Sequence, residues 1–462
     1  ITPFQKRGLQ FMVCPGILNS YRLIPDMAMA TANIDGFLPE GKASGASGVI
    51  TTVWDDGGAY LFSGDWYGVY KAADKSWNVT AAGKPSFDAR YTATAYGTVD
   101  ESYTRALDAM MTLRKLPLTY NLTDNIWNQK LLPDSGRQLI LNNTDVDTAL
   151  QIIYRAKKLI DAAKPQWHSS DINTLKLSIE QYRLIMEGRR QMPLIAAHYR
   201  KALDMAVSNP STSVSLLTGA AKAVSDLKNR YLALQSAFRK AWLHENQLYS
   251  LDIATRPYDT RIKDLQHLQN KLQQAVQSIS HHVALPGDAA MRLDIVENAH
   301  YYFQNWLLCG PFAVDGANKL PAFLYSGDAA TEQAPKPGDL ISFHQKSFRW
   351  QKYASPNGGI TELDDFYPAG KGQGAYAFCT ITTDKALTTA AFMAASSGME
   401  AFCNGVKVSG APTGEPSVKK EEKLLLSLKA GTNHLLLKIP AGTAAWSFSF
   451  RLDPKLDVTN QK

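Results

Sequence analysis

The pattern of apolar and polar residues divides the chain into three parts with different periodicities. In residues 1–92, short apolar runs alternate with stretches of helical spacing, which is typical of βα units in a parallel sheet. Residues 93–294 repeat apolar positions at the spacing of amphipathic helices, with short connections between them. Residues 295–462 carry short alternating runs between Gly and Pro turns, which predicts a two-sheet β-sandwich. We therefore expect a multidomain protein with α/β, helical and β-sandwich parts.

The most informative stretch of the first part is GVITTVWDDGG, residues 48–58. Its apolar run, residues 49–53, predicts a strand buried on both faces. The run ends in Trp54, Asp55 and Asp56, so an indole and two carboxylates stand where a buried strand reaches the surface. An indole face can stack on a sugar ring, and carboxylates accept hydrogen bonds from sugar hydroxyls. The alternative is a core tryptophan followed by an Asp/Gly turn.

Helices are predicted on both sides of this strand. Residues 24–45 have helical spacing, and an apolar run at residues 9–14 precedes them. After the strand, Asp65 can cap a helix that continues to Trp77. The order strand, helix, strand, helix with short connections is that of a parallel α/β fold.

These motifs together resemble the end of the catalytic barrel of family 20 glycoside hydrolases, the β-N-acetylhexosaminidases. The resemblance is carried by the run ending in Cys-Pro-Gly at residues 14–16, by residues 48–58, and by DWYG and AADKSWN at residues 65–68 and 72–78. It implies that residues 1–92 are the last two βα units of a (β/α)8 TIM barrel.

The resemblance also implies substrate-binding roles. Trp54 would form a wall of the pocket for the N-acetyl group, and Asp56 would bind the outer hydroxyls of the sugar. The family commonly has Glu at that second position, so the shorter side chain leaves open whether Asp55 or Asp56 makes this contact. The family also tends to carry a Tyr with a nearby Asp after the seventh strand, and here Tyr21 and Asn19 are the nearest candidates.

Family 20 chemistry is retaining and substrate-assisted, with an Asp–Glu pair after the fourth strand of the barrel. That strand is expected upstream of Ile1, so we predict no catalytic residue in this chain. The resemblance then implies the C-terminal part of a secreted enzyme, periplasmic or extracellular, that removes terminal N-acetylhexosamine from glycans. Its partners would be the glycan and the N-terminal part of the same barrel. The alternatives are a non-catalytic carbohydrate-binding or structural protein with a degenerate barrel, and a glycosidase of another family.

Two further resemblances concern the later parts. The WLHEN segment resembles one in the helical tails of family 20 relatives, and it places Trp242, Glu245, Asn246 and Tyr249 within two turns. These residues either extend the sugar cleft or, as we favour, hold the helices to the barrel. Residues 398–408, with a tight Asn-Gly turn, resemble galactose-binding jelly-roll domains. Such a resemblance indicates a fold and not an activity.

Composition and charge argue against several classes of function. The formal charge of +7 is small for 462 residues and the basic residues are dispersed, so nucleic-acid binding is not expected. No apolar run approaches the roughly 18 residues that span a bilayer. We predict no cofactor, because the helical region carries no cofactor signature. We predict no metal site, because the four cysteines have no metal-ligand spacing. Two of these cysteines, Cys379 and Cys403, could form a disulfide.

Overall fold

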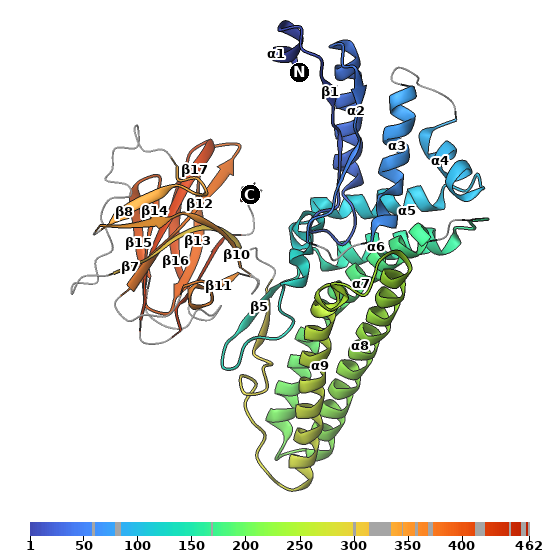
Figure 1. The fold of residues 1–462 in the computed structure, drawn as a ribbon. Helices are drawn as coiled ribbons and strands as arrows, with labels where there is room; N and C mark the ends of the chain where they lie inside the picture. Colours follow the sequence, from blue (N-terminus) through green and yellow to red (C-terminus); the bar gives the residue numbers. More distant parts are fainter. Residues whose placement is uncertain are drawn as a thin grey trace. The chain divides into compact units, whose positions relative to one another are not determined.

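The protein forms two compact units. The first comprises residues 1–128 and 145–287, and the second comprises residues 129–144 and 288–462. The computed structural model (Figure 1) describes residues 1–57, 61–78, 85–167, 170–298, 302–313, 334–343, 345–355, 359–367, 373–411, 421–442, 445–453 and 459–460.

The first unit begins with a mixed α/β region. Strand β1 pairs in parallel with β3, and β2 pairs in parallel with β4. The predicted order of strand, helix, strand, helix is therefore confirmed. The elements are α1 (Thr2–Lys6), β1 (Met12–Val13), β2 (Gly16–Leu18), α2 (Met27–Ala43), β3 (Gly48–Val49), β4 (Thr52–Trp54), a 3-10 turn (Phe62–Asp65) and α3 (Trp66–Trp77).

The predicted single strand at residues 49–53 is wrong in two respects. The chain forms two short strands there, β3 and β4, each paired with a different partner. The strands are also not buried on both faces, since Ile50 is 50% exposed between them. Among the described residues each parallel sheet has two strands, and α2 packs against β1 and β2. Within the described residues these strands do not close into a barrel.

Helix α2 shows how the sequence pattern produces the local structure. The Asp26 carboxylate accepts a hydrogen bond from the Met29 backbone N–H at 2.9 Å and so caps the first turn. The buried side chains Met27, Ile34 and Leu38 fall on one helix face, which packs into the core of the unit. The helix predicted within residues 24–45 is confirmed.

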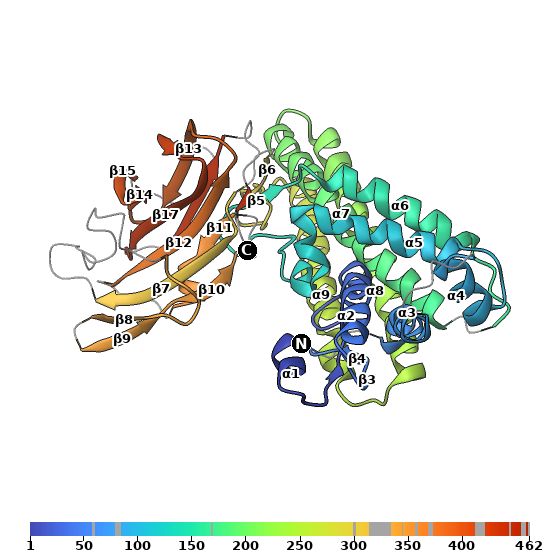
Figure 2. The same cartoon turned by 90° about the horizontal axis from the view of Figure 1, so that it is seen from above.

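The remainder of the first unit is helical. Helix α6 packs on α5 and α7, α7 packs on α8, and α8 packs on α9 (Figures 1 and 2). Asp145 is the N-cap residue of α6, and α7 continues through Pro193. The helices are α4 (Phe87–Tyr96), α5 (Ser102–Met111), α6 (Val146–Ala162), α7 (Ser170–Met205), α8 (Pro210–Glu245) and α9 (Leu251–Ser280).

Two antiparallel sheets make up most of the second unit. One has the strand order β10-β7-β12-β17-β14-β15, with β19 beside β12, and the other has the order β11-β18-β13-β16. The main strands are β7 (Asn305–Ala313), β10 (Gln351–Ala354), β11 (Ile360–Glu362), β12 (Gln373–Thr383), β13 (Leu387–Ala395), β14 (Met399–Cys403), β15 (Val406–Ala411), β16 (Glu422–Leu428), β17 (Gly431–Pro440), β18 (Ser447–Leu452) and β19 (Thr459–Asn460).

The two sheets share one hydrophobic core. Trp306 on β7 of the first sheet packs edge-on against Phe448 on β18 of the second, with ring centroids 5.2 Å apart. Alternating side chains of both sheets complete this core, as the period-two pattern predicts. The turn between β14 and β15 has positive φ at both Asn404 and Gly405, which is the hairpin geometry that this dipeptide favours.

A segment from the middle of the chain also belongs to the second unit. Strand β5 (Leu139–Asn142) pairs in parallel with β6 (Ile295–Asn298). Just before β5, Arg137 contacts the buried Glu362 at 3.0 Å and Asp364 at 2.8 Å. The boundaries predicted from sequence, 1–92, 93–294 and 295–462, place this segment with the helices.

We expect Arg137→Ala to destabilise the second unit, because the change leaves the buried Glu362 carboxylate with less compensating positive charge. Breaking a buried ion pair costs about 3–5 kcal/mol, and the partial exposure of Arg137 reduces this to about 2 kcal/mol. Urea unfolding measures the loss. Arg349→Ala, at an exposed position on β9 (Lys346–Arg349), is the matched control. Equal midpoints for the two variants would contradict the stabilising role of Arg137.

Candidate functional site

The residues predicted for substrate binding come together at the carboxyl ends of two parallel strands. Asn19 follows β2, and its backbone N–H donates to the carbonyl of Trp54 at 2.8 Å. Two residues later, the N–H of Tyr21 donates to the carbonyl of Asp56 at 2.9 Å. These bonds extend the pairing of β2 with β4 beyond the strands and place Asp55 within the same edge. In parallel α/β sheets, this edge is where ligands bind.

Trp54 is held in place and open to solvent. Its indole N–H donates to Thr52 Oγ1 at 3.0 Å, and its ring lies over Gly16, where a Cβ atom would come within 3.3 Å of the indole Cδ1. The residue is nevertheless 52% exposed. Trp54 is therefore not part of the core that the described residues form.

The loop residues around the tryptophan are fixed by local contacts. Tyr21 has a left-handed backbone and an exposed ring that lies against Gly57. A Cβ atom at position 57 would lie 2.7 Å from that ring, so the approach requires glycine. Ser20 Oγ donates to the Asp56 carboxylate at 3.2 Å and accepts from the Asp56 N–H at 3.1 Å. The Asp56 side chain is thus partly engaged, and Asp55 has the freer carboxylate of the two.

Sequence reasoning missed Asp65 as a site residue and expected only a helix cap. Its side chain makes no capping hydrogen bond to α3, and instead its carboxyl accepts a hydrogen bond from Asn19 Nδ2 at 2.9 Å. Both side chains are fully buried. Burial raises the pKa of Asp65 to about 7, and the negative charges of Asp55 and Glu245 act in the same direction. The hydrogen bond from Asn19 opposes this rise. In the sequence, Asp65 stands out as a helix start and as the first residue of DWYG, and neither signal points to its contact with Asn19.

The WLHEN segment connects α8 to the strand-end region. The Glu245 carboxylate accepts hydrogen bonds from the Ser63 backbone N–H, at 3.0 Å, and from the Ser63 hydroxyl. The same hydroxyl lies 2.6 Å from Thr174 Oγ1 on α7. Trp242 is buried and donates its indole N–H to the carbonyl of Gln247 at 2.8 Å. Glu245 thus holds the end of α8 to the turn before α3, in line with the packing role that we favoured, whereas the hydrogen bond of Trp242 stays within its own segment.

Asn246 and Tyr249, the other two residues of this segment, have exposed side chains. They do not share the contacts of Glu245 with the Ser63 turn.

A small cavity lies behind the strand-end residues. It has a volume of about 20 Å³ and is lined by Asn19, Thr174, Ser178, Gln181 and apolar neighbours. This volume and its polar lining suit one water molecule. Asn19 Oδ1 and Asp65 Oδ1 are buried atoms without a hydrogen-bond partner among the described residues. A water in this cavity could bond to Asn19.

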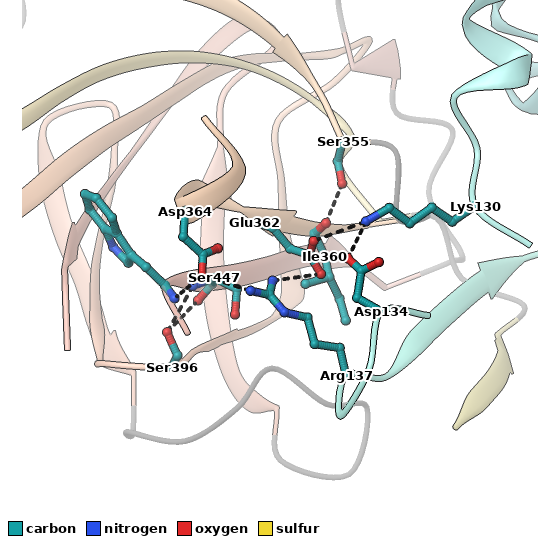
Figure 3. A network of polar contacts seen from close by, with 10 residues as sticks. Lys130, Asp134, Arg137, Ser355, Ile360, Glu362, Asp364, Ser396 and Ser447 are labelled. Carbon is teal, nitrogen blue, oxygen red and sulfur yellow. Dashed lines mark hydrogen bonds and ion pairs between the residues drawn. The ribbon is translucent and has the colours of Figure 1, made fainter. Parts of the chain in front are cut away.

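A separate group of carboxylates in the second unit has the spacing of a metal site. One oxygen each from Asp134, Glu362 and Asp365 lies within 4.8 Å of the others. Figure 3 shows that two cations already approach this group: Lys130 Nζ lies 2.5 Å from Asp134 and 3.5 Å from Glu362, and Arg137 lies 3.0 Å from Glu362. Burial raises the pKa of Glu362 to about 6. We assign no metal here, because Lys130 and Arg137 supply the positive charge.

The four cysteines do not form a metal-binding group either. All four are free thiols, so Cys379 and Cys403 do not form the disulfide that the sequence left open. Both thiols are buried in the core shared by the two sheets, where burial raises their pKa values.

Comparison with protein-family models gives no match for this chain, and comparison with curated proteins gives no matching sequence. Across the part of the chain that the structure describes, no helix combines the length and apolar character needed to cross a bilayer.

We expect the raised pKa of Asp65 to appear as a pH-dependent stability. A carboxyl whose pKa is higher in the folded protein stabilises it fully below the unfolded value of 3.8, and this contribution is lost as the pH rises through about 7. The loss is on the order of 4 kcal/mol at most. Urea unfolding at pH 5.5 and pH 8.5 measures about half of this loss, because the other half occurs between pH 3.8 and pH 5.5.

In Asp65→Asn the pH-dependent contribution should disappear, because the neutral amide still accepts the hydrogen bond from Asn19. Asp56→Asn, at an exposed position of the same edge, should keep the wild-type profile. Identical pH profiles for the wild type and Asp65→Asn would show that Asp65 is ionised in the folded protein.

Proposed function

We propose that this chain is the C-terminal part of a glycoside hydrolase resembling the β-N-acetylhexosaminidases, which removes terminal N-acetylhexosamine from glycans by a retaining, substrate-assisted mechanism. One observation carries the proposal. A rigidly held, half-exposed Trp54 stands beside Asp55 and Asp56 at the carboxyl ends of parallel strands. The proposed site is substrate-binding, with no catalytic residue in this chain.

Each side chain has a role that its environment supports. The open face of Trp54 suits the apolar face of a sugar or its N-acetyl group. The Asp55 carboxylate can accept from sugar hydroxyls, while Ser20 holds Asp56. Buried behind them, the Asn19–Asp65 pair fixes the ends of β2 and α3.

The finer fold is part of the proposal. We propose that β1 to α3 are the last two βα units of a TIM barrel whose other strands carry the catalytic Asp–Glu pair. Parallel sheets are normally covered on both faces, whereas here Met12 on β1 and Ile50 between β3 and β4 are about half exposed. Neighbouring strands of a barrel would cover them. The partners are thus a glycan and the N-terminal part of this barrel, in a periplasmic or extracellular location and without a cofactor.

We further propose that the C-terminal sheets form a jelly roll of the galactose-binding type. The support is two antiparallel sheets around one core, together with the Asn404-Gly405 hairpin. This likeness concerns the fold and assigns no sugar site to the second unit.

A second candidate is a non-catalytic carbohydrate-binding protein, which one observation favours. Asp65 has a pKa near neutrality, as a general acid needs, but it is fully buried and cannot touch a substrate. The same edge can therefore bind a sugar without hydrolysing it. The complete protein can be tested with a chromogenic N-acetylglucosaminide. Hydrolysis would support the hexosaminidase, whereas no hydrolysis would support the carbohydrate-binding protein or a glycosidase of another family.

Trp54→Ala tests the sugar site directly. Calorimetric titration of the 462-residue chain with N-acetylglucosamine should show binding at least about threefold weaker in the variant, because the stacking contact is lost. The melting temperature should change little, since half of the side chain is already exposed. A buried tryptophan would instead cost about 3–5 kcal/mol of stability.

Trp77→Ala is the matched control, since Trp77 is 89% exposed and lies at the other end of α3. It should bind N-acetylglucosamine like the wild type. Asp55→Asn should weaken binding without loss of stability. If Trp54→Ala and Asp55→Asn both bind like Trp77→Ala, the strand-end edge is not the sugar site.

A further inference from the structure

A long groove runs along α6, α7 and α8 in the first unit. Helices α6 and α8 both pack on α7 without packing extensively on each other (Figures 1 and 2), and the groove of about 1030 Å³ is lined by all three. Its α8 wall extends from Arg230 to Glu245. At 1.5 Å per residue this wall is about 22 Å long, which is the length of a helix of about 15 residues.

The side chains that line the groove recur at intervals of three and four residues. Such intervals place them on one stripe of each helix. The stripe on α7 contains Asn173, Lys176, Leu177 and Glu180, and the stripe on α8 contains Arg230, Ala233, Leu234, Ala237, Ala241 and His244. Ala233 and Ala237 are exposed, although apolar positions at this spacing normally face another element. The two stripes therefore have the form of a binding surface for one more helix.

Apolar side chains form the floor of this surface. Ile160 on α6, Leu177 on α7 and Leu234 on α8 lie there with the three alanines of α8. Because alanine side chains are small, a further helix can approach α8 closely. Helices pack at interaxial distances of about 8–10 Å, so one helix can contact both stripes at once. A single alkyl chain is narrower and would leave one of the stripes in contact with water.

The acidic side chains of the lining already have partners within the first unit. They are Asp161, which pairs with Lys157, Glu180, which pairs with Arg183, and Glu245, which accepts a hydrogen bond from the Ser63 N–H. Arg230 is paired as well, since it contacts Glu187 on α7. These charges are therefore largely compensated.

Two basic side chains of the lining are not compensated in this way. Lys176 on α7 and Lys240 on α8 are exposed, and neither has a hydrogen-bond or ion-pair partner among the described residues. Helices α7 and α8 run antiparallel across a short connection, and Glu187 pairs with Arg230 across them. Eleven residues before Glu187 is Lys176, and eleven residues after Arg230 is position 241, beside Lys240. Two uncompensated ammonium groups therefore lie at one level of the groove, one on each wall.

We propose that this groove binds an acidic amphipathic helix of about 15 residues from a partner protein. The apolar side of that helix lies on the alanines of α8, and its acidic side chains pair with Lys176 and Lys240. The helical spacing of the lining selects a helix, and the uncompensated positive charge selects an acidic one. The lining contains none of the strand-end residues, so this binding does not depend on the proposed sugar site.

The test uses a fluorescein-labelled synthetic peptide of about 15 residues, with leucines at intervals of three and four and glutamates at the flanking positions. Fluorescence anisotropy with the 462-residue chain measures its affinity. A peptide with lysine in place of each glutamate is the control, and it should bind at least about tenfold more weakly. Added salt should weaken the binding of the acidic peptide, because the two lysines are exposed.

Charge reversal tests the two lysines. Lys176→Glu combined with Lys240→Glu should weaken binding of the acidic peptide at least about fivefold, because two attractions become two repulsions. The same variant should bind the basic peptide more tightly than the wild type does. Lys222→Glu, at an exposed position of α8 outside the groove, is the matched control and should bind both peptides like the wild type.

A second pair of variants tests the floor. Ala237→Phe fills the groove and should abolish binding of the acidic peptide. Ser236→Phe, at the adjacent exposed position outside the groove, should retain it. The melting temperature of each variant checks its folding.

Three results would overturn the proposed occupant. The first is that the acidic peptide does not bind, and the second is that the acidic and basic peptides bind equally or that the double charge reversal changes nothing. The third is that decanoate binds and Ala237→Phe abolishes its binding while the acidic peptide does not bind, which would make the groove a site for an anionic lipid. None of these results bears on the sugar site.

Discussion

The first unit depends on the hydrogen bonds made by Ser63 in the 3-10 turn Phe62–Asp65, which we call the Ser63 turn. The backbone N–H and hydroxyl of Ser63 are both bonded to Glu245, which lies 182 residues later in the chain, and the hydroxyl also meets Thr174. A buried donor left unpaired costs about 1–3 kcal/mol, so the turn is stable only when α7 and α8 are in place. The strand-end loops and the long helices are therefore one folding unit, although their sequence patterns differ.

The same turn determines the electrostatics of the site. It leads directly into Asp65, whose side chain is fully buried. That burial raises the pKa of Asp65 to about 7, with smaller contributions from the charges of Asp55 and Glu245. Asp65 therefore changes its charge near neutral pH, while the open face of Trp54 and the exposed Asp55 stay in contact with solvent.

The elements that the sequence predicted correctly are those that depend on the spacing of apolar residues within one element. The spacing in α2 and the alternation in β12 to β18 each reflect burial within a single element, and the Asn404-Gly405 turn depends only on two residues. The predicted strand-end residues were also correctly placed near one another, because parallel strands end at one edge. What the pattern could not show is pairing between distant positions. Three contacts are of this kind. Asn19 bonds to Asp65, 46 positions later, and Ser63 bonds to Glu245, 182 positions later. Arg137 contacts Glu362, more than 200 positions later.

The pairing of β5 with β6 has a consequence for how the chain assembles. Parallel strands need a crossover connection, and here that connection contains all of α6 to α9, so the long helices are an insertion within the second unit. During synthesis, the fully buried side chains of Leu139, Ile140 and Leu141 remain without their partner strand until residue 295 has been made. The helices have mostly local contacts and can form in this interval, whereas β5 must wait for β6, with which it forms a two-stranded sheet separate from the two large sheets. The helical insertion therefore folds before the unit that contains it.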